Sequence, residues 1–119
     1  MEKEEPPWGK WENLLGYHQG MGYKVKRITV RPKECLSLQR HQHRDEFWVV
    51  VSGTGKMTLD KDVFFLQKGK SIFISKTVAH RVENTGEIPL IIIEVQIGEI
   101  LEEEDIVRIE DKYGREDIM

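Results

Sequence analysis

Apolar and polar side chains alternate with a period of two over most of this chain, which predicts β-strands rather than helices. Strands are expected over residues 11–18 and 22–30, joined by a glycine-rich turn at 19–22. The breaker Arg31-Pro32-Lys33 precedes a central strand, and the apolar run 47–52 is typical of a strand covered on both faces. The first half of the chain therefore predicts an antiparallel sheet.

The second half of the chain predicts short strands separated by regularly spaced turns. Glycines and charged residues mark turns near 53–55, 60–62, 69 and 85–87, and no helical period occurs before the tail at 98–115. This pattern predicts an all-β fold, a small antiparallel jelly-roll barrel. The strands expected between the turns are 56–59, 63–66, 71–75, 80–83 and 90–97.

Length and composition narrow the class of protein. The chain has 119 residues, a net charge of −3 and one cysteine. This length supports one domain, expected over residues 8–119, and the charged segment 1–7, which ends in Pro-Pro, is expected to be a flexible arm. The lone Cys35 and the lack of a leader or membrane-length apolar run predict a cytoplasmic protein. The near-neutral charge predicts neither a nucleic-acid nor a membrane partner.

Candidate chemistry is concentrated just before the apolar run. Gln39, His41 and His43 share one face of the strand that starts at Leu36, and the carboxylate of Glu46 follows them. Because Glu46 leads directly into the apolar run, these groups are expected to be buried. Converging buried imidazole and carboxylate groups are most simply satisfied by a metal ion, a metal-free hydrogen-bonded cluster being the alternative. His43 is open to three roles: ligand, acid/base group, or support for a neighbour.

The spacing of several residues resembles the two motifs of the cupin superfamily, G-x5-H-x-H-x(3,4)-E-x6-G and G-x5-P-x-G-x2-H-x3-N. Glu46 and Gly53 keep the spacing of the first motif, and Gly69, His80 and Asn84 keep that of the second. The resemblance implies the cupin form of the antiparallel jelly-roll barrel.

The wider sequence, from about residue 6 to 115, resembles the type II phosphomannose isomerase domain, for example at Pro7-Trp8-Gly9 and Ile93-Glu94-Val95-Gln96. Counting back from Glu46 places the paired-ligand positions on Gln39 and His41, and a glutamine there is similar to these isomerases. The resemblance implies a divalent metal, with zinc the expected ion and Mn, Co, Fe or Ni the alternatives. Its implied ligands are Gln39, His41, Glu46 and His80.

Three residues depart from the family motifs. Lys33, Ser75 and Thr77 stand where the motifs have Gly, Pro and Gly. All three are turn positions, so we expect an effect on turn conformation rather than on the metal site.

The resemblance implies reversible isomerisation of mannose 6-phosphate to fructose 6-phosphate through a cis-enediol, a step in GDP-mannose biosynthesis. The domain usually forms the C-terminal part of a bifunctional phosphomannose isomerase/GDP-mannose pyrophosphorylase. Because this chain begins almost at Pro7-Trp8-Gly9, we expect a stand-alone isomerase without guanylyltransferase activity. The fold hosts many functions, so a non-catalytic metal- or sugar-binding cupin, a cupin dioxygenase and a sugar-nucleotide epimerase are the alternatives.

The implied reaction assigns further roles. It needs a base near C1 and C2 of the sugar, for which Glu94 is the first candidate and His43 the second. Glu94 and Gln96 alternate within an apolar strand and are expected to face the barrel cavity, where Gln96 would contact the substrate; a solvated sheet face is the alternative. Arg27 and Arg44 are the expected phosphate partners, because a guanidinium group can bond two phosphate oxygens.

Homodimerisation is common among cupins and is expected here. The apolar strand at 90–97, together with exposed tryptophans, is expected to supply the interface. For Trp8 and Trp11, a cap on the end of the barrel is the alternative to this role.

Overall fold

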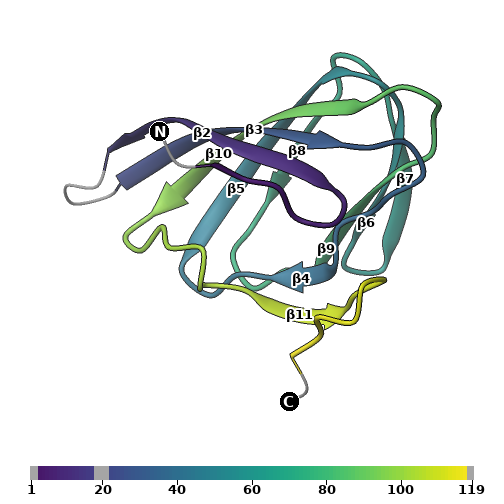
Figure 1. The fold of residues 1–119 in the computed structure, drawn as a ribbon. Coiled ribbons are helices and arrows are strands. Elements are labelled where there is room, and N and C mark those ends of the chain that lie inside the picture. Colours follow the sequence, from purple (N-terminus) through teal and green to yellow (C-terminus); the bar gives the residue numbers. More distant parts are fainter. Residues whose placement is uncertain (1–2, 18–21, 118–119) are drawn as a thin grey trace.

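The computed structural model describes residues 3–17 and 22–117, and every regular element in these ranges is a β-strand (Figure 1). The all-β prediction is therefore confirmed. The strands are β1 (Lys3–Glu4), β2 (Gly9–Tyr17), β3 (Gly22–Val30), β4 (Leu38–Arg40), β5 (Arg44–Ser52), β6 (Gly55–Leu59), β7 (Asp62–Leu66), β8 (Ser71–Ile74), β9 (His80–Asn84), β10 (Leu90–Gly98) and β11 (Val107–Glu110).

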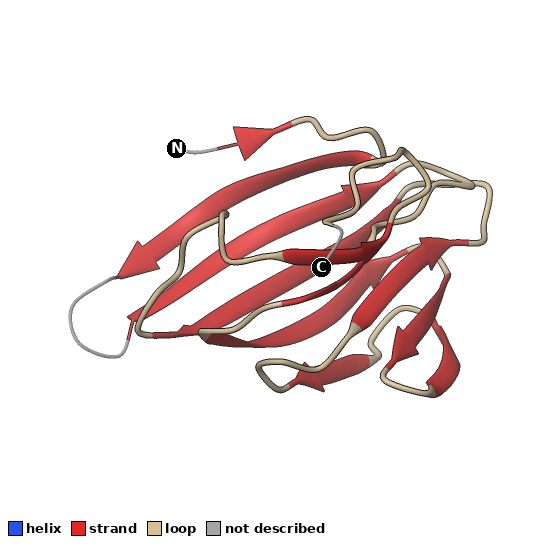
Figure 2. Ribbon diagram, turned by 90° about the horizontal axis from the view of Figure 1, so that it is seen from below, coloured by secondary structure: helices blue, strands red, loops and turns tan. Residues whose placement is uncertain are grey.

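The strands form two antiparallel sheets that enclose the interior between them (Figure 2). The large sheet has six strands in the order β1-β2-β3-β10-β5-β8, and the small sheet has five in the order β11-β4-β9-β6-β7. Consecutive strands often lie in different sheets, as β4 and β5 do, so residues close in sequence reach the interior from both sides.

The inner face of the large sheet changes from apolar to polar along the strands. At one end, Leu90 of β10 lies opposite Val30 of β3, and both are fully buried. Together with Trp48, Met57 and Val82, they belong to the hydrophobic core. The other end is polar yet equally buried, so its groups need partners. Its inward-facing residues are Lys24 and Lys26 on β3, Glu94 and Gln96 on β10, and Arg44 and Glu46 on β5.

The N-terminal segment contains a short strand. Lys3 and Glu4 of β1 pair with Glu12 and Trp11 of β2, and Nε1 of Trp11 donates a hydrogen bond to the Glu4 carboxylate (3.2 Å). Flexibility of residues 1–7 stays a prediction. The turn predicted at 19–22 lies almost entirely outside the described residues, which exclude 18–21.

Candidate metal centre and active site

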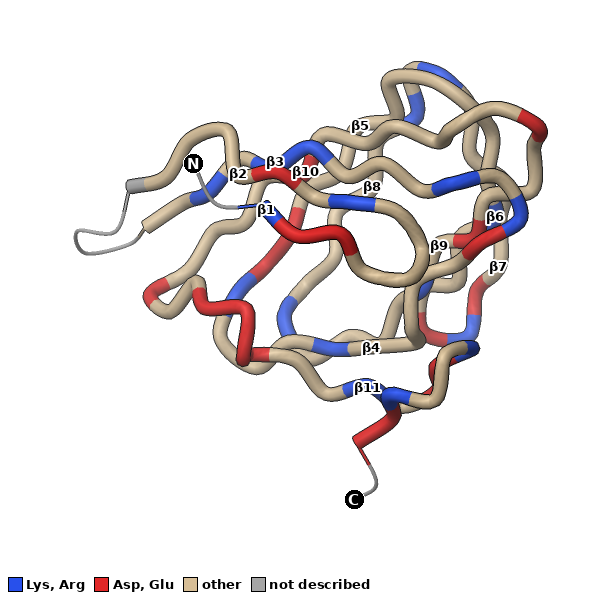
Figure 3. The backbone as a smooth tube through the Cα atoms, viewed as in Figure 1, with Lys and Arg blue, Asp and Glu red and all other residues tan. Residues whose placement is uncertain are grey.

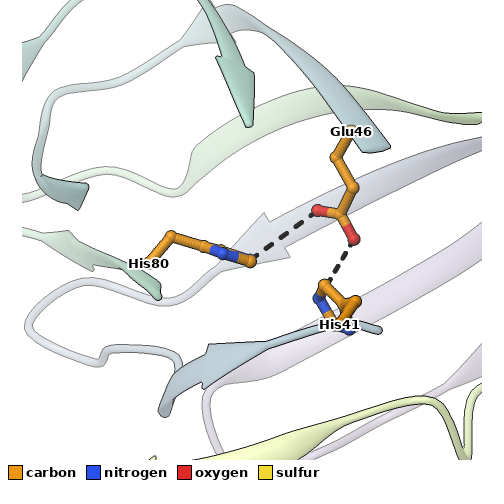
Figure 4. Close-up of side chains that lie close together, drawn as sticks. All are labelled: His41, Glu46 and His80. Atoms are coloured by element: carbon orange, nitrogen blue, oxygen red, sulfur yellow. Dashed lines mark ion pairs between the residues drawn. The ribbon is translucent and has the colours of Figure 1, made fainter. Parts of the chain in front are cut away.

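Three side chains from both sheets meet at the polar end of the interior (Figure 4). Glu46 comes from β5 of the large sheet, His80 opens β9 of the small sheet, and His41 follows the end of β4. Nε2 of His41 lies 3.1 Å from Oε2 of Glu46, and Nε2 of His80 lies 3.8 Å from Oε1. One potential ligand atom from each residue lies within 4.8 Å of the others, and all three residues are buried.

The other ring nitrogens of the two histidines fix which atoms face this cluster. Nδ1 of His41 lies 2.7 Å from the carbonyl oxygen of Asp105, and Nδ1 of His80 lies 2.9 Å from that of Val78. Because a carbonyl oxygen only accepts, Nδ1 carries the proton in each ring and Nε2 presents a lone pair. Nε2 of His80 is buried with no hydrogen-bond partner in the described part of the chain. Two inward lone pairs beside a carboxylate fit a divalent cation.

Gln39 lies at the edge of this cluster. It pairs with His80 across β4 and β9, and its Nε2 lies 3.5 Å from Nε2 of His41. Its Oε1 accepts a hydrogen bond from the Ser37 hydroxyl at 2.7 Å. Because a hydroxyl can also accept, Ser37 can satisfy the amide in either orientation, and Gln39 can turn its oxygen toward a cation.

Arg44 is buried beside the cluster. Its Nε donates to Oε2 of Glu46 (2.8 Å), its Nη2 lies 3.3 Å from Nε2 of His41, and its Nη1 donates to the carbonyl of Glu102 (3.2 Å). Trp48 Nε1 donates to Oε1 of Glu46 at 2.9 Å. Glu46 thus accepts hydrogen bonds at both carboxylate oxygens.

These contacts set the charge of the cluster. Burial alone would raise the pKa of Glu46, but Arg44, His80 and the hydrogen bonds to the carboxylate hold it below its ordinary value. Burial, followed by the charges of Arg44 and His80, lowers the pKa of His41 to about 3. At neutral pH the site therefore holds an ionised carboxylate and a neutral His41 imidazole, the forms that bind a metal ion.

Glu94 and Gln96 both face the interior, as their alternation predicts. Nε2 of Gln96 donates to Oε1 of Glu94 at 2.7 Å, and Gln96 lies opposite Glu46 across β10 and β5. Burial, reinforced by the negative charge of Glu46, raises the pKa of Glu94 to about 7. This carboxyl group can therefore gain or lose a proton near neutral pH, which suits a general base.

Two of the predicted placements are wrong. His43 does not share a face with His41: its side chain is exposed, because β4 ends at Arg40, and Arg44 rather than His43 begins the inward-facing set of β5. Arg27 lies on the outer face of β3, where its Nη2 contacts Oε1 of Glu12 at 3.0 Å.

The inward cations of β3 are Lys24 and Lys26, which sequence reasoning missed. The sequence does indicate this placement, because Lys24 and Lys26 alternate in step with the apolar Ile28 and Val30 and so share their face of the strand. Trp8 and Trp11 were expected to be exposed, but both are buried in the core.

Two of the three unusual turn residues have a positive φ, a region that glycine occupies most readily. Lys33 has φ of 67° and Thr77 has φ of 70°. The backbone N–H of Thr77 donates to the carbonyl of His41 at 2.6 Å, and that of Val78 donates to Ser75 at 3.2 Å. The turn beside the metal centre is therefore kept despite the substitutions.

The fold is of the cupin type, the antiparallel jelly-roll barrel that the sequence predicts. Similar solved structures include the cupin domain of Schizosaccharomyces pombe Cnp3, with a TM-score of 0.68, 10% identity, and coverage of 75% of this chain and 64% of that one. A double-stranded beta-helix domain protein from Klebsiella pneumoniae has a TM-score of 0.70, 19% identity, and coverage of 83% and 77%. These likenesses show the fold alone.

The chain belongs to the family described as "Mannose-6-phosphate isomerase C-terminal", whose model matches residues 2–111. The predicted family is thereby confirmed. The chain is 51% identical to an Escherichia coli mannose-1-phosphate guanylyltransferase and 50% identical to the alginate biosynthesis protein AlgA of Pseudomonas syringae pv. tomato. Each match covers 92% of this chain but only 22% of the relative's length. None of the described residues belongs to a helix able to cross a membrane.

Proposed function

We propose that this chain is a metal-dependent aldose–ketose isomerase that interconverts mannose 6-phosphate and fructose 6-phosphate. The observation that carries the proposal is the pairing, in one buried site, of a His-Glu-His cluster with the Glu94 carboxyl, whose pKa is raised to about 7. Membership of the isomerase family supports the choice of a phosphosugar as substrate.

Gln39, His41, Glu46 and His80 would hold the metal ion, for which we propose zinc. When bound, the ion would polarise the oxygens at C1 and C2 of the open-chain sugar and favour the enediol. The role of Arg44 follows from its contact with Glu46: it keeps the Glu46 carboxylate ionised and fixes its orientation. Its Nη2 contact with Nε2 of His41 would give way to the metal ion, because that nitrogen has one lone pair. The donor set is thus positioned before the substrate arrives.

Glu94 is the proposed base. Its carboxylate takes the proton from C2 of mannose 6-phosphate while a water molecule gives a proton to O1, which yields the cis-enediol. The same carboxyl group then returns its proton to C1, the O2 hydroxyl gives its proton to the hydroxide left by that water, and the C2 carbonyl forms. Gln96 holds the Glu94 carboxyl through its Nε2, and its buried Oε1, which has no partner among the described residues, is left to accept a bond from a sugar hydroxyl. The exposed side chain of His43 argues against the second candidate base.

The direct test is a coupled assay for fructose 6-phosphate formed from mannose 6-phosphate, with and without chelator and added Zn, Mn or Co. We expect turnover that chelator removes, that a metal restores, and that His80→Ala abolishes. Absence of turnover from folded, metal-loaded protein would contradict the proposal and favour a cupin that only binds its ligand.

We also propose that the chain is a cytoplasmic homodimer. The free thiol of Cys35 fits a reducing compartment. The outward-facing side chains of β5, β8 and β10 are largely apolar, which is unusual for a solvated sheet face. They include Phe47, Val49 and Val51 on β5, Phe73 on β8, and Ile91, Ile93, Val95 and Ile97 on β10.

A further inference from the structure

Two lysines are buried on the inner face of β3, which is rare for this residue type. Lys24 is 5% exposed and Lys26 is 3% exposed. They lie opposite Gln96 and Glu94 of β10, respectively, and those residues in turn lie opposite Glu46 and Trp48 of β5. A row of cations thus runs parallel to the proposed catalytic groups, two strands away from Glu46.

The ammonium group of Lys26 is held by an aromatic ring and a carboxylate. Its Nζ lies 3.8 Å from the centre of the Trp11 ring and forms an ion pair with Glu103. Glu103 belongs to the acidic segment 99–105 between β10 and β11 (Figure 3). A partly exposed acidic side chain from a connecting segment is therefore the anionic partner of this buried ammonium group.

Two backbone carbonyls of the same segment accept hydrogen bonds from side chains at the metal centre. The carbonyl of Glu102 accepts from Arg44, and the carbonyl of Asp105 accepts from Nδ1 of His41. In the sequence, Glu103 lies between Glu102 and Asp105. Movement of this segment would consequently expose Lys26 and change the surroundings of two residues of the metal centre.

Two pockets adjoin Glu103. One, of about 480 Å³, reaches Gln39 at the edge of the metal centre, and the other, of about 490 Å³, reaches Lys24. Trp11 and Glu103 line both pockets. Glu103 therefore borders both the pocket beside Gln39 and the pocket beside Lys24.

We infer that Lys26 and Lys24 form the subsite for the phosphate group of the sugar phosphate, and that the Glu103 carboxylate occupies it until the phosphate displaces it. This inference rests on the proposed function. Two strand spacings separate β3 from β5 by about 10 Å. An open-chain hexose 6-phosphate with its C1–C2 end at Glu46 and Glu94 spans a similar distance to its phosphorus. A phosphate dianion offers more negative charge and more acceptor atoms than a carboxylate, so it can replace Glu103 on the ammonium group.

The test measures binding of inorganic phosphate by isothermal titration calorimetry, on the purified protein with its bound metal and at low salt. Lys26→Gln is expected to weaken phosphate binding at least about tenfold, because it removes a charge-assisted contact. Glu103→Gln is expected to strengthen it by about fivefold to tenfold, because it removes the competing anion. The matched controls Lys10→Gln, on the exposed part of β2, and Glu99→Gln, in the same acidic segment, should bind as the wild type does.

Equal phosphate affinity in the wild type, Lys26→Gln and Glu103→Gln would contradict the proposed subsite. This is the result expected if phosphate binds to the metal ion instead. Because Glu103→Gln predicts a gain, misfolding of a Lys26 variant cannot produce the expected pattern. Lys26→Arg, which keeps the charge, should retain binding within about threefold.

The outcome for the subsite can be separated from that for the proposed reaction. If the phosphate pattern appears but mannose 6-phosphate is not turned over, the isomerase proposal fails and the anion subsite stands. If turnover occurs but Lys26→Gln leaves both phosphate affinity and the KM for mannose 6-phosphate unchanged, the subsite fails and the isomerase stands.

Discussion

Thr77 holds a left-handed backbone conformation, with φ of 70°, that is strongly disfavoured for a β-branched side chain. Its side chain is exposed, so no packing contact compensates for this strain. Replacing it with glycine should relieve the strain while keeping the N–H bond to His41. We expect Thr77→Gly to raise the free energy of unfolding by about 1 kcal/mol in urea denaturation.

The reverse change gives the control. Gly69 has φ of 89°, and a Cβ added there would meet no atom within 4 Å, so only backbone strain would change. Gly69→Thr should lower the free energy of unfolding by a similar amount. A Thr77→Gly variant no more stable than the wild type would show that the turn is not strained.

Glu94 is the residue on which the proposed proton transfer depends. Glu94→Gln keeps the size of the side chain and can still contact Gln96, but it cannot accept a proton. Turnover of mannose 6-phosphate should fall by a factor of about 100 to 10,000, the usual contribution of a general base. Metal content, measured by atomic emission, should stay at the wild-type level. A near-wild-type rate would remove Glu94 from this role.

The low pKa of His41 predicts how the metal-free protein responds to acid. The folded state holds His41 neutral down to about pH 3, whereas the unfolded chain protonates it near pH 6.5. Unfolding therefore takes up a proton below pH 6.5, so this stabilisation is present above 6.5 and lost as the pH falls toward 3. Glu94, with a pKa of about 7 in the folded state, has the opposite effect over this range, so the His41 effect is predicted for the Glu94→Gln variant. In that variant, the free energy of unfolding should fall by roughly 1 kcal/mol per pH unit between pH 6.5 and 5.

Urea denaturation of chelator-treated Glu94→Gln protein at pH 7, 6 and 5 measures this slope. Adding His41→Gln should flatten it, because the substituted side chain does not titrate. An equal slope in Glu94→Gln and in the double variant would assign the acid sensitivity to other groups.

At the scale of the element, two-residue alternation predicts the interior wherever a strand runs without a break. It places Glu94 and Gln96 correctly, because β10 is continuous from Leu90 to Gly98. It fails at His43, because the chain leaves β4 and enters β5 of the other sheet between Gln39 and Glu46, and alternation does not survive such a crossing. The first cupin motif located Glu46 because it spans that crossing, and the second located His80 because it spans the crossing from β8 to β9.

The partners of the buried charges could not be predicted from local pattern. Alternation places Lys26 on the same face of β3 as Ile28 and Val30, but its ion pair is with Glu103, which is distant in sequence. The same is true of Arg44 and the carbonyl of Glu102. Such pairs depend on how the segment between β10 and β11 crosses the end of the barrel.

Asn84, which the second motif identifies, joins three elements at the apolar end of the barrel. Its Nδ2 donates to the carbonyls of Val30 and Ile88, and its Oδ1 accepts from the N–H of Gly86, each at 2.9 Å. Asn84→Ala would remove all three hydrogen bonds, of which the one to Val30 is buried and the other two are partly buried. We expect it to lower the free energy of unfolding by about 3 kcal/mol, whereas Thr85→Ala, at an exposed neighbouring position, should change it little.

Metal content distinguishes a role of Asn84 in stability from a role in the metal centre. Asn84 is the last residue of β9 and His80 is the first, so Asn84 lies away from the metal centre. The metal content of the folded fraction should therefore stay at the wild-type level. A stable Asn84→Ala protein that had lost its metal would assign Asn84 a role in the site instead.

At the scale of the whole molecule, the two sheets have different outer surfaces. The outer side of the large sheet carries apolar side chains on three adjacent strands, among them Phe73, which is 53% exposed on β8 and pairs with Phe47 of β5. Burying this surface against the same surface of a second copy would give an interface with twofold symmetry. Trp8 and Trp11 take no part, because they lie in the core.

Two exposed phenylalanines allow the dimer to be tested with matched variants. Phe73→Lys puts a charge into the proposed interface, and Phe65→Lys puts the same charge on β7 of the small sheet, where Phe65 is 71% exposed. In sedimentation velocity, the wild type and Phe65→Lys should migrate as dimers, and Phe73→Lys should shift to the monomer because an unpaired ammonium group opposes burial. A wild-type protein that sediments as a monomer would contradict the proposed dimer. A dimer that only Phe65→Lys disrupts would move the interface to the small sheet, and the apolar outer face of β5, β8 and β10 would then need another partner.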